Sequence, residues 1–195
     1  MFHLPCVIFA GGKSSRMGED KSLLPFGSYQ TLTEFQYAKL SKIFKNVYIS
    51  CKDKNKFNFD ANFIEDDDKN TYAPTTGFVS AFKALNAESI FILSVDAPFV
   101  NEEVITTMVE NLDKNLDAII AKTDRGIEPL CGIYNRSLEK RFQMMQDTNS
   151  HKLGFLLKSA QTKYLYFSDK SLFTNLNHPE EYKKAFSSYL NKKGV

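Results

Sequence analysis

Short apolar runs alternate along this chain with segments in which apolar residues recur at helical spacing. The clearest run spans residues 89–95 and reads Ser-Ile-Phe-Ile-Leu-Ser-Val, which is typical of a strand buried on both faces. Residues 77–85 show the second pattern, because Phe78, Ala81 and Phe82 fall on one face of a helix. By the same patterns, strands are predicted at residues 4–10, 47–51, 62–65, 89–95, 117–122, 130–134 and 163–167, and helices at 31–44, 77–85, 102–112, 137–146, 152–158 and 179–190.

This alternation predicts a three-layer α/β fold with a mostly parallel, Rossmann-like sheet. Continuous apolar strands fit a sheet that is covered by helices on both faces. In such sheets ligands bind outside the carboxyl ends of the strands, so we expect the loop after residue 10 and Asp96 to share one edge. The 195 residues contain no linker, repeat or low-complexity tract, and a single domain is expected.

Composition and charge narrow the class of protein. A hydrophobic content of 43% and a charged content of 25% are ordinary for a globular domain. A net charge of +2 does not favour binding to nucleic acid or to a membrane surface. Cys6, Cys51 and Cys131 show no metal-binding spacing, which favours free thiols in a reducing compartment. No stretch approaches the roughly 18 apolar residues of a membrane span, so we expect a cytoplasmic protein.

A glycine-rich loop at residues 10–21 follows the first predicted strand and reads Ala-Gly-Gly-Lys-Ser-Ser-Arg-Met-Gly-Glu-Asp-Lys. The backbone N–H groups of Gly11 and Gly12 can approach an anion closely, and Arg16 and Lys21 add positive charge. The loop matches neither the dinucleotide fingerprint nor the Walker A pattern. The alternative is a plain glycine turn with surface basic residues, but the combination favours a phosphate-binding loop.

Two acidic positions also follow predicted strands. Asp96 comes directly after the strand at 89–95 and is followed by Ala-Pro, so it could hold Mg²⁺ or could only cap a turn. Because Asp96 is expected to share its sheet edge with a phosphate-binding loop, the metal-binding role is the better interpretation. The four acids at residues 65–68 could form a solvated loop, or one could point inward. An inward carboxylate could accept hydrogen bonds from N1–H and the N2 amine of guanine.

Two later segments are less decisive. Residues 128–134 read Glu-Pro-Leu-Cys-Gly-Ile-Tyr and fit a plain loop and strand. Asn175 and Asn177 precede Pro-Glu-Glu, which is an ordinary start for a helix. The two amides could bind a polar ligand or could only brace the turn, and spacing alone favours bracing.

Taken together, these residues resemble the molybdenum cofactor guanylyltransferases, within the wider nucleotidyltransferase group. The family opens with L-A-G-G-x-x-x-R-M-G-x-D-K, which this chain matches at residues 9–21. The other matches are I-E-D at 64–66, D-x-P at 96–98, P-L-x-G-x-Y at 129–134 and F-x-N-x-N-x-P-E at 173–180. The resemblance covers nearly the whole chain in order, and the closing motif narrows it to the molybdopterin branch.

The chain departs from the family pattern at four places. Phe9 replaces the usual Leu, and Ser50 stands where an Asn is often found. The G-P-L-A-G loop of the family appears as Ala-Pro-Thr-Thr-Gly at residues 73–77, which puts contacts to the base or ribose in doubt. His178 stands where Thr is commoner.

The resemblance implies transfer of GMP from Mg²⁺-GTP to the phosphate of molybdopterin, in a nucleotidyltransferase fold. It implies that Arg16, Lys21 and Asp96 are catalytic and that Asp96 holds Mg²⁺. The implied GTP-binding residues are Phe9, Ala10, Gly11, Gly12, Lys21, Ser50, Asp66 and Asp96, and the implied molybdopterin-binding residues are Asn175 and Asn177.

The single domain at 1–195 would then have a nucleotide-binding half at about 1–100 and an acceptor-binding half at about 101–190. Proteins that deliver or receive the cofactor are possible further partners. Two alternatives stay open: a related nucleotidyltransferase that uses CTP or a sugar phosphate, and a non-catalytic nucleotide-binding protein.

Overall fold

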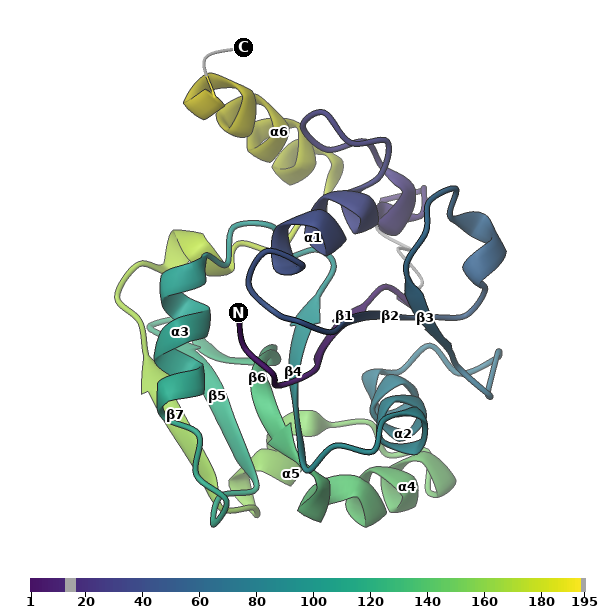
Figure 1. Ribbon diagram of the computed structural model, residues 1–195, viewed down its shortest axis with the longest axis vertical. Helices are drawn as coiled ribbons and strands as arrows, with labels where there is room; N and C mark the ends of the chain where they lie inside the picture. The colour runs from purple at the N-terminus through teal and green to yellow at the C-terminus, as the bar shows by residue number, and fades with distance from the viewer. Residues whose placement is uncertain (13–16, 194–195) are drawn as a thin grey trace.

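The computed structural model describes residues 1–12 and 17–193 and shows a central sheet between two layers of helices (Figure 1). The strands of the described residues form one sheet in the order β3-β2-β1-β4-β6-β5-β7. Their bounds are β1 (Cys6–Phe9), β2 (Val47–Cys51), β3 (Asn62–Glu65), β4 (Ser89–Ser94), β5 (Ala118–Thr123), β6 (Gly126–Asn135) and β7 (Thr162–Tyr166). The helices are α1 (Leu32–Leu40), α2 (Pro74–Ala84), α3 (Glu102–Glu110), α4 (Glu139–Asp147), α5 (Leu153–Lys158) and α6 (Pro179–Lys193). Short 3₁₀ turns are η1 (Lys21–Leu23), η2 (Lys54–Lys56), η3 (Arg136–Leu138) and η4 (Lys170–Phe173).

Every strand pair in the sheet is parallel except those of β6, which runs antiparallel to both β4 and β5. The prediction of a three-layer α/β fold with a mostly parallel sheet is therefore confirmed. Because β1, β2, β3 and β4 are parallel, their carboxyl ends meet at one edge of the sheet.

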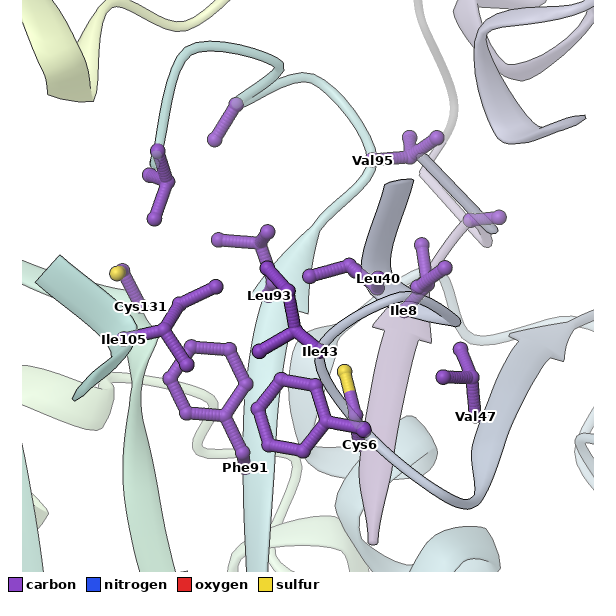
Figure 2. Packing of buried hydrophobic residues seen from close by; sticks show 14 of the residues in the cluster. Cys6, Ile8, Leu40, Ile43, Val47, Phe91, Leu93, Val95, Ile105 and Cys131 are labelled. Carbon is purple, nitrogen blue, oxygen red and sulfur yellow. The ribbon is translucent and has the colours of Figure 1, made fainter. Parts of the chain in front are cut away.

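Two hydrophobic clusters explain why the sheet is covered on both faces. Successive strand residues point to opposite faces, so Phe91 and Leu93 enter one cluster while Ile90 and Ile92 enter the other. The first cluster includes side chains of α1, α3 and α6 and is shown in part in Figure 2. The second includes side chains of α2, α4 and α5. An apolar run without alternation thus becomes a strand that is buried on both sides.

The predicted element bounds are right for β2 and β3, and the others differ at their ends. The first helix ends at Leu40 rather than at residue 44, because the following turn pairs with the amino-terminal segment: Phe2 N–H donates to the Ile43 carbonyl (2.8 Å). The third predicted helix begins at Glu102, and Asn101 caps it by accepting from Val104 N–H (3.0 Å).

Two further bounds differ for local reasons. α2 begins three residues earlier than predicted, at Pro74, because proline fits the first helical position, where no N–H is needed. The helix predicted at 137–146 divides into η3 and α4.

Cys6, Cys51 and Cys131 are buried free thiols, as expected from their positions in apolar runs. Among the helices at residues 1–12 and 17–193, none has the length and apolar content needed to cross a membrane.

Candidate active site

Two cavities lie side by side at the carboxyl edge of the parallel strands. Each has a volume of about 180 Å³, and Ser94, Asp96 and Leu130 line both of them. The first cavity is also lined by Phe9, Gly11, Gly12, Ser50, Lys52, Asp66, Tyr72, Ala73, Pro74 and Gly77. The second is also lined by Ala97, Glu128, Pro129, Cys131, Phe173, Asn175 and Asn177. Asp96 therefore stands at the junction of the two.

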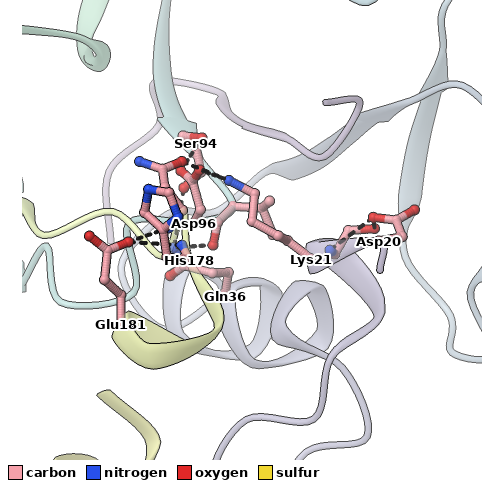
Figure 3. Close-up of polar contacts among 10 residues, drawn as sticks. Asp20, Lys21, Gln36, Ser94, Asp96, His178 and Glu181 are labelled. Atoms are coloured by element: carbon pink, nitrogen blue, oxygen red, sulfur yellow. Dashed lines mark hydrogen bonds and ion pairs between the residues drawn. The ribbon is translucent and has the colours of Figure 1, made fainter. Parts of the chain in front are cut away.

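Lys21 and Asp96 are in direct contact at this junction, as expected for groups on one sheet edge. The Lys21 Nζ atom lies 2.5 Å from Asp96 Oδ2, and each side chain is 13% exposed. Lys21 Nζ also donates to Asn177 Oδ1 (3.0 Å), and Ser94 Oγ donates to the other Asp96 oxygen (2.6 Å) (Figure 3). Residues that lie 75 and 156 positions apart from Lys21 thus meet in one polar cluster.

An ion pair between Lys56 and Asp20 stabilises the turn that carries Lys21. The Asp20 carboxylate caps η1 by accepting from Ser22 N–H (3.0 Å). Lys56 in η2 donates to the same carboxylate (2.8 Å) and to the Ser22 hydroxyl (2.9 Å). A smaller cavity of about 50 Å³, lined by Ala10, Gly12 and Lys21 among others, separates the glycine loop from Asp96.

Helix α1 holds the backbone around Asp96. The Gln36 side-chain amide donates to the Ala97 carbonyl (3.1 Å), and Lys39 Nζ donates to the carbonyls of Pro98 (2.8 Å) and Val100 (3.1 Å). Burial lowers the pKa of the Lys39 ammonium to about 7. This support was not predicted from the sequence, although two polar residues three positions apart on a buried helix face are a signal for it.

One acid of the run at 65–68 does point inward, and it is Asp66, which is only 4% exposed. Ser50 Oγ donates to Asp66 Oδ1 (3.2 Å), and Lys52 Nζ lies 3.2 Å from Asp66 Oδ2. A Cβ atom on Gly11 would lie 3.6 Å from the same Oδ2, so the glycine loop passes directly over this carboxylate. Lys52 was not among the predicted residues, because a single lysine after a strand is usually solvated.

The start of α2 packs tightly on the first cavity. A Cβ atom on Gly77 would lie 3.0 Å from the Phe9 ring and 3.1 Å from Ser50 Oγ, so a larger residue would require these side chains to shift. The Phe9 ring also packs edge-on against Phe78 at 5.0 Å between centroids. Within residues 73–77, where the chain differs from the family pattern, Thr75 Oγ1 lies 2.6 Å from His151 Nδ1. This contact connects the start of α2 to the loop before α5.

The segment at 128–134 is a bulged strand rather than a plain loop and strand. Opposite β5, the register jumps so that Ile120 pairs with Gly132 but Ala121 pairs with Glu128. The Tyr134 hydroxyl donates to the Pro129 carbonyl across this bulge (2.5 Å). A Cβ atom on Gly132 would lie 2.7 Å from the Ile119 carbonyl oxygen. The spacing P-L-x-G-x-Y is thus explained by one bulge, which turns Glu128 toward the second cavity.

The segment before α6 docks on Asp96 through its backbone. Leu176 N–H donates to the Asp96 carbonyl (2.9 Å). The turn itself is braced by Glu181, which accepts from Asn177 N–H (2.8 Å) and His178 N–H (2.9 Å) (Figure 3). The Asn177 side chain is turned to Lys21, and Asn175 lines the second cavity. The spacing favoured bracing by the two Asn side chains, but Glu181 braces the turn and the Asn177 side chain contacts Lys21 instead.

The oxygen atoms around Asp96 fit a magnesium ion that is held partly by its substrate. Within residues 1–12 and 17–193, no group of three His, Cys, Asp or Glu side chains could form a complete metal cage. Mg²⁺ is commonly held by one or two carboxylates together with substrate phosphates, and Asp96 with the nearby Ser94 hydroxyl matches that donor set. Arg16 lies outside the described residues.

Most of this chain is similar to proteins of a known family. Residues 6–163 match the MobA-like NTP transferase domain. The molybdenum cofactor guanylyltransferase of Campylobacter jejuni subsp. doylei is 44% identical over 93% of this chain and 94% of that protein. That of Helicobacter pylori strain G27 is 31% identical over 94% of this chain and 92% of that protein. The crystal structure of molybdopterin-guanine dinucleotide biosynthesis protein A from Archaeoglobus fulgidus shares the fold, with a TM-score of 0.83 at 23% identity over 96% of this chain and 100% of that one.

Proposed function

The chain belongs to the MobA-like NTP transferase family, among the molybdenum cofactor guanylyltransferases, and from this premise we propose that it transfers GMP from Mg²⁺-GTP to the phosphate of molybdopterin. The products are a guanine dinucleotide cofactor and pyrophosphate. The observation that carries the proposal is the cluster of Lys21, Asp96 and Asn177 at the junction of two cavities. A reaction between two substrates needs a cavity for each and charged groups where they meet.

The chemistry is an in-line displacement at phosphorus. A phosphate oxygen of molybdopterin forms a bond to the α-phosphorus of GTP, and the bond from that phosphorus to the pyrophosphate oxygen breaks. The leaving pyrophosphate takes the bonding electron pair. The attacking phosphate is already ionised near neutral pH, so no general base is required. Because two polyanions must approach each other, positioning and charge neutralisation dominate the catalysis.

The first cavity is the proposed GTP site. The amides of Gly11 and Gly12, with Arg16 and Lys21, bind the triphosphate. Phe9 lines this cavity, Ala10 lines the smaller cavity beside it, and the Ser50 and Asp66 side chains face the base. When the triphosphate arrives, the Lys21 ammonium turns from the Asp96 carboxylate toward the phosphates. Lys21 then stabilises the charge that develops on the leaving pyrophosphate.

Asp96 is the proposed magnesium ligand. When bound there, Mg²⁺ would neutralise phosphate charge and polarise the reacting phosphorus. Gln36 and Lys39 keep the Asp96 backbone in place, and Ser94 orients its carboxylate.

The second cavity is the proposed molybdopterin site, with Asn175 and Asn177 as its polar contacts. The halves at about 1–100 and 101–190 then serve GTP and acceptor respectively, and residue 177 reaches across to Lys21. Delivery and acceptor proteins for the cofactor are further proposed partners. We place the reaction in the cytoplasm, where the three buried thiols stay reduced.

The test is to incubate the protein with Mg²⁺, molybdopterin and each nucleoside triphosphate, and to separate the products. Among the nucleoside triphosphates, only GTP should give a dinucleotide product and pyrophosphate. A product from CTP would assign the chain to cytidylyl transfer, and transfer to a sugar phosphate would change the acceptor. Absence of pyrophosphate with every nucleotide would make the protein a non-catalytic binder.

A further inference from the structure

One wall of the first cavity carries an ion pair built by two neighbouring parallel strands. Cys51 at the end of β2 pairs in register with Glu65 at the end of β3. Lys52 and Asp66, the residues that follow these strand ends, are therefore side by side, and Lys52 Nζ lies 3.2 Å from Asp66 Oδ2. Their side chains are 13% and 5% exposed, and both line the cavity. The sheet thus presents a cation and a carboxylate together at one wall.

The hydrogen-bond partners of Lys52 leave it able to bind a ligand. An ammonium carries three N–H donors. The ammonium forms an ion pair with Asp66, and one N–H donates to the Asp68 carbonyl (2.5 Å). Lys52 Nζ also lies 5.6 Å from the centroid of the Tyr72 ring, which is itself a cavity residue. A third N–H direction remains for an acceptor in the cavity.

The Ser50 hydroxyl cannot supply that donor. Its one hydrogen is donated to Asp66 Oδ1, so Ser50 orients the carboxylate instead of contacting a base as a donor. The cavity wall therefore offers a donor from Lys52 beside acceptors from Asp66. Buried ion pairs contribute little net stability, so the placement of this pair at a cavity wall rather than on the surface calls for a ligand.

We propose that Lys52 and Asp66 together read the edge of guanine, with Lys52 donating to O6 while Asp66 accepts from N1–H and the N2 amine. Guanine presents one acceptor followed by two donors along this edge, and the ion pair presents the complement. Adenine presents a donor and then an acceptor, so both of its positions would be mismatched. Uracil would match at two positions but lacks the second donor. Lys52 is thus a specificity-determining residue for the nucleotide.

This inference rests on the proposed GTP site, and nucleotide analogues that differ from GTP by one group test it. 6-Thio-GTP replaces O6 by sulfur, a much weaker acceptor, and ITP lacks only the 2-amino group. Dissociation constants for the three Mg²⁺-nucleotides are measured by calorimetry without acceptor, for wild type and for Lys52→Met. Lys54→Met is the control, since Lys54 is the neighbouring lysine whose side chain is 55% exposed.

Wild type should bind GTP about tenfold more tightly than 6-thio-GTP, and Lys52→Met should abolish that preference. The variant should keep the preference for GTP over ITP, which depends on Asp66. Lys54→Met should behave as wild type. A preference for GTP over 6-thio-GTP that survives in Lys52→Met, or an equal loss of affinity for all three nucleotides, would overturn the assignment.

Two outcomes separate this inference from the proposed function. If wild type itself does not distinguish GTP from 6-thio-GTP, the inference fails whether or not the variant folds. If O6-dependent binding is found but no GMP reaches molybdopterin, the assignment of Lys52 stands and the proposed acceptor is wrong.

Discussion

The two cavities differ in how their carboxylates are held. Asp66 in the first is buried, paired with Lys52 and hydrogen-bonded by Ser50. Glu128 in the second is half-buried, and its carboxylate makes no hydrogen bond or ion pair with the described residues. Burial raises the pKa of this carboxyl, although the nearby charge of Arg125 acts to lower it. The carboxylate at the first wall is therefore held in place by protein side chains, whereas the described residues do not orient the one at the second wall.

The difference follows from how each cavity is built. The first is formed at the ends of adjacent parallel strands, whose register fixes side chains relative to one another. The second depends on a bulge in the antiparallel strand β6 and on the segment before α6, which is held mainly through backbone bonds. We therefore expect changes in the first cavity to alter which nucleotide is used, and changes in the second to alter how well the acceptor binds.

The largest effect is expected at the junction that both cavities share. Lys21→Ala or Asp96→Ala should lower GMP transfer by about a thousandfold or more, because charge neutralisation at the reacting phosphates is lost. Pyrophosphate release measures the rate, and circular dichroism checks that the fold survives. Asp67→Ala, which removes an exposed acid, is the control and should change little. Near-wild-type turnover in either junction variant would remove that residue from the mechanism.

A smaller, selective effect is expected for Asp66→Asn. An amide replaces one of the two acceptor oxygens by an NH2 donor, so kcat/KM for GTP should fall about ten- to a hundredfold while other nucleotides change less. Competition between nucleotides in one reaction measures the ratio. Glu65→Gln at the exposed neighbouring acid should leave the ratio unchanged. An equal loss for every nucleotide would show that Asp66 supports the fold instead of selecting the base.

In the second cavity we expect Tyr134→Phe to act on the acceptor. Losing the hydroxyl leaves the Pro129 carbonyl without its bond across the bulge, which should lower the free energy of unfolding by about 1–2 kcal/mol. KM for molybdopterin should rise several-fold while KM for GTP stays unchanged. Tyr166→Phe, at a tyrosine exposed on β7, is the matched control. A rise in KM for GTP instead would mean that the two cavities are not separable.

The smallest effect concerns Lys39, which supports the shared junction. Its pKa is lowered in the folded protein, so between about pH 7 and the ordinary lysine pKa the unfolded chain binds more protons than the folded one. Stability should therefore rise with pH through this window, by about 1 kcal/mol per pH unit relative to Lys39→Met. Urea unfolding of both proteins from pH 6 to 9 measures the difference, with Lys42→Met as the exposed control. A difference that is constant over this range would contradict the lowered pKa.

Much of this arrangement could be predicted because it depends on local pattern. The apolar strands fixed where Asp96 and the glycine loop would lie, and the contact between Lys21 and Asp96 follows from the shared sheet edge. The acidic run left open whether a carboxylate points inward and the family resemblance named Asp66, which the structure places beneath Gly11.

What could not be predicted depends on contacts between distant segments. The position of Lys52 beside Asp66 depends on the register of β2 and β3. The role of Gln36 depends on hydrogen bonds to carbonyls 58 to 61 residues away. The bulge in β6 requires both the Tyr134 hydroxyl and the close approach of Gly132 to Ile119. None of these pairings is encoded in local spacing.

The docking of Leu176 and Asn177 on the junction also sets an order of assembly during synthesis. The strands β1 to β4 that form the first cavity are translated before residue 96, but the bond from Leu176 to Asp96 and the contact from Asn177 to Lys21 need nearly the whole chain. Most of the residues that line the first cavity are therefore synthesised well before the segment that completes the junction of the two cavities.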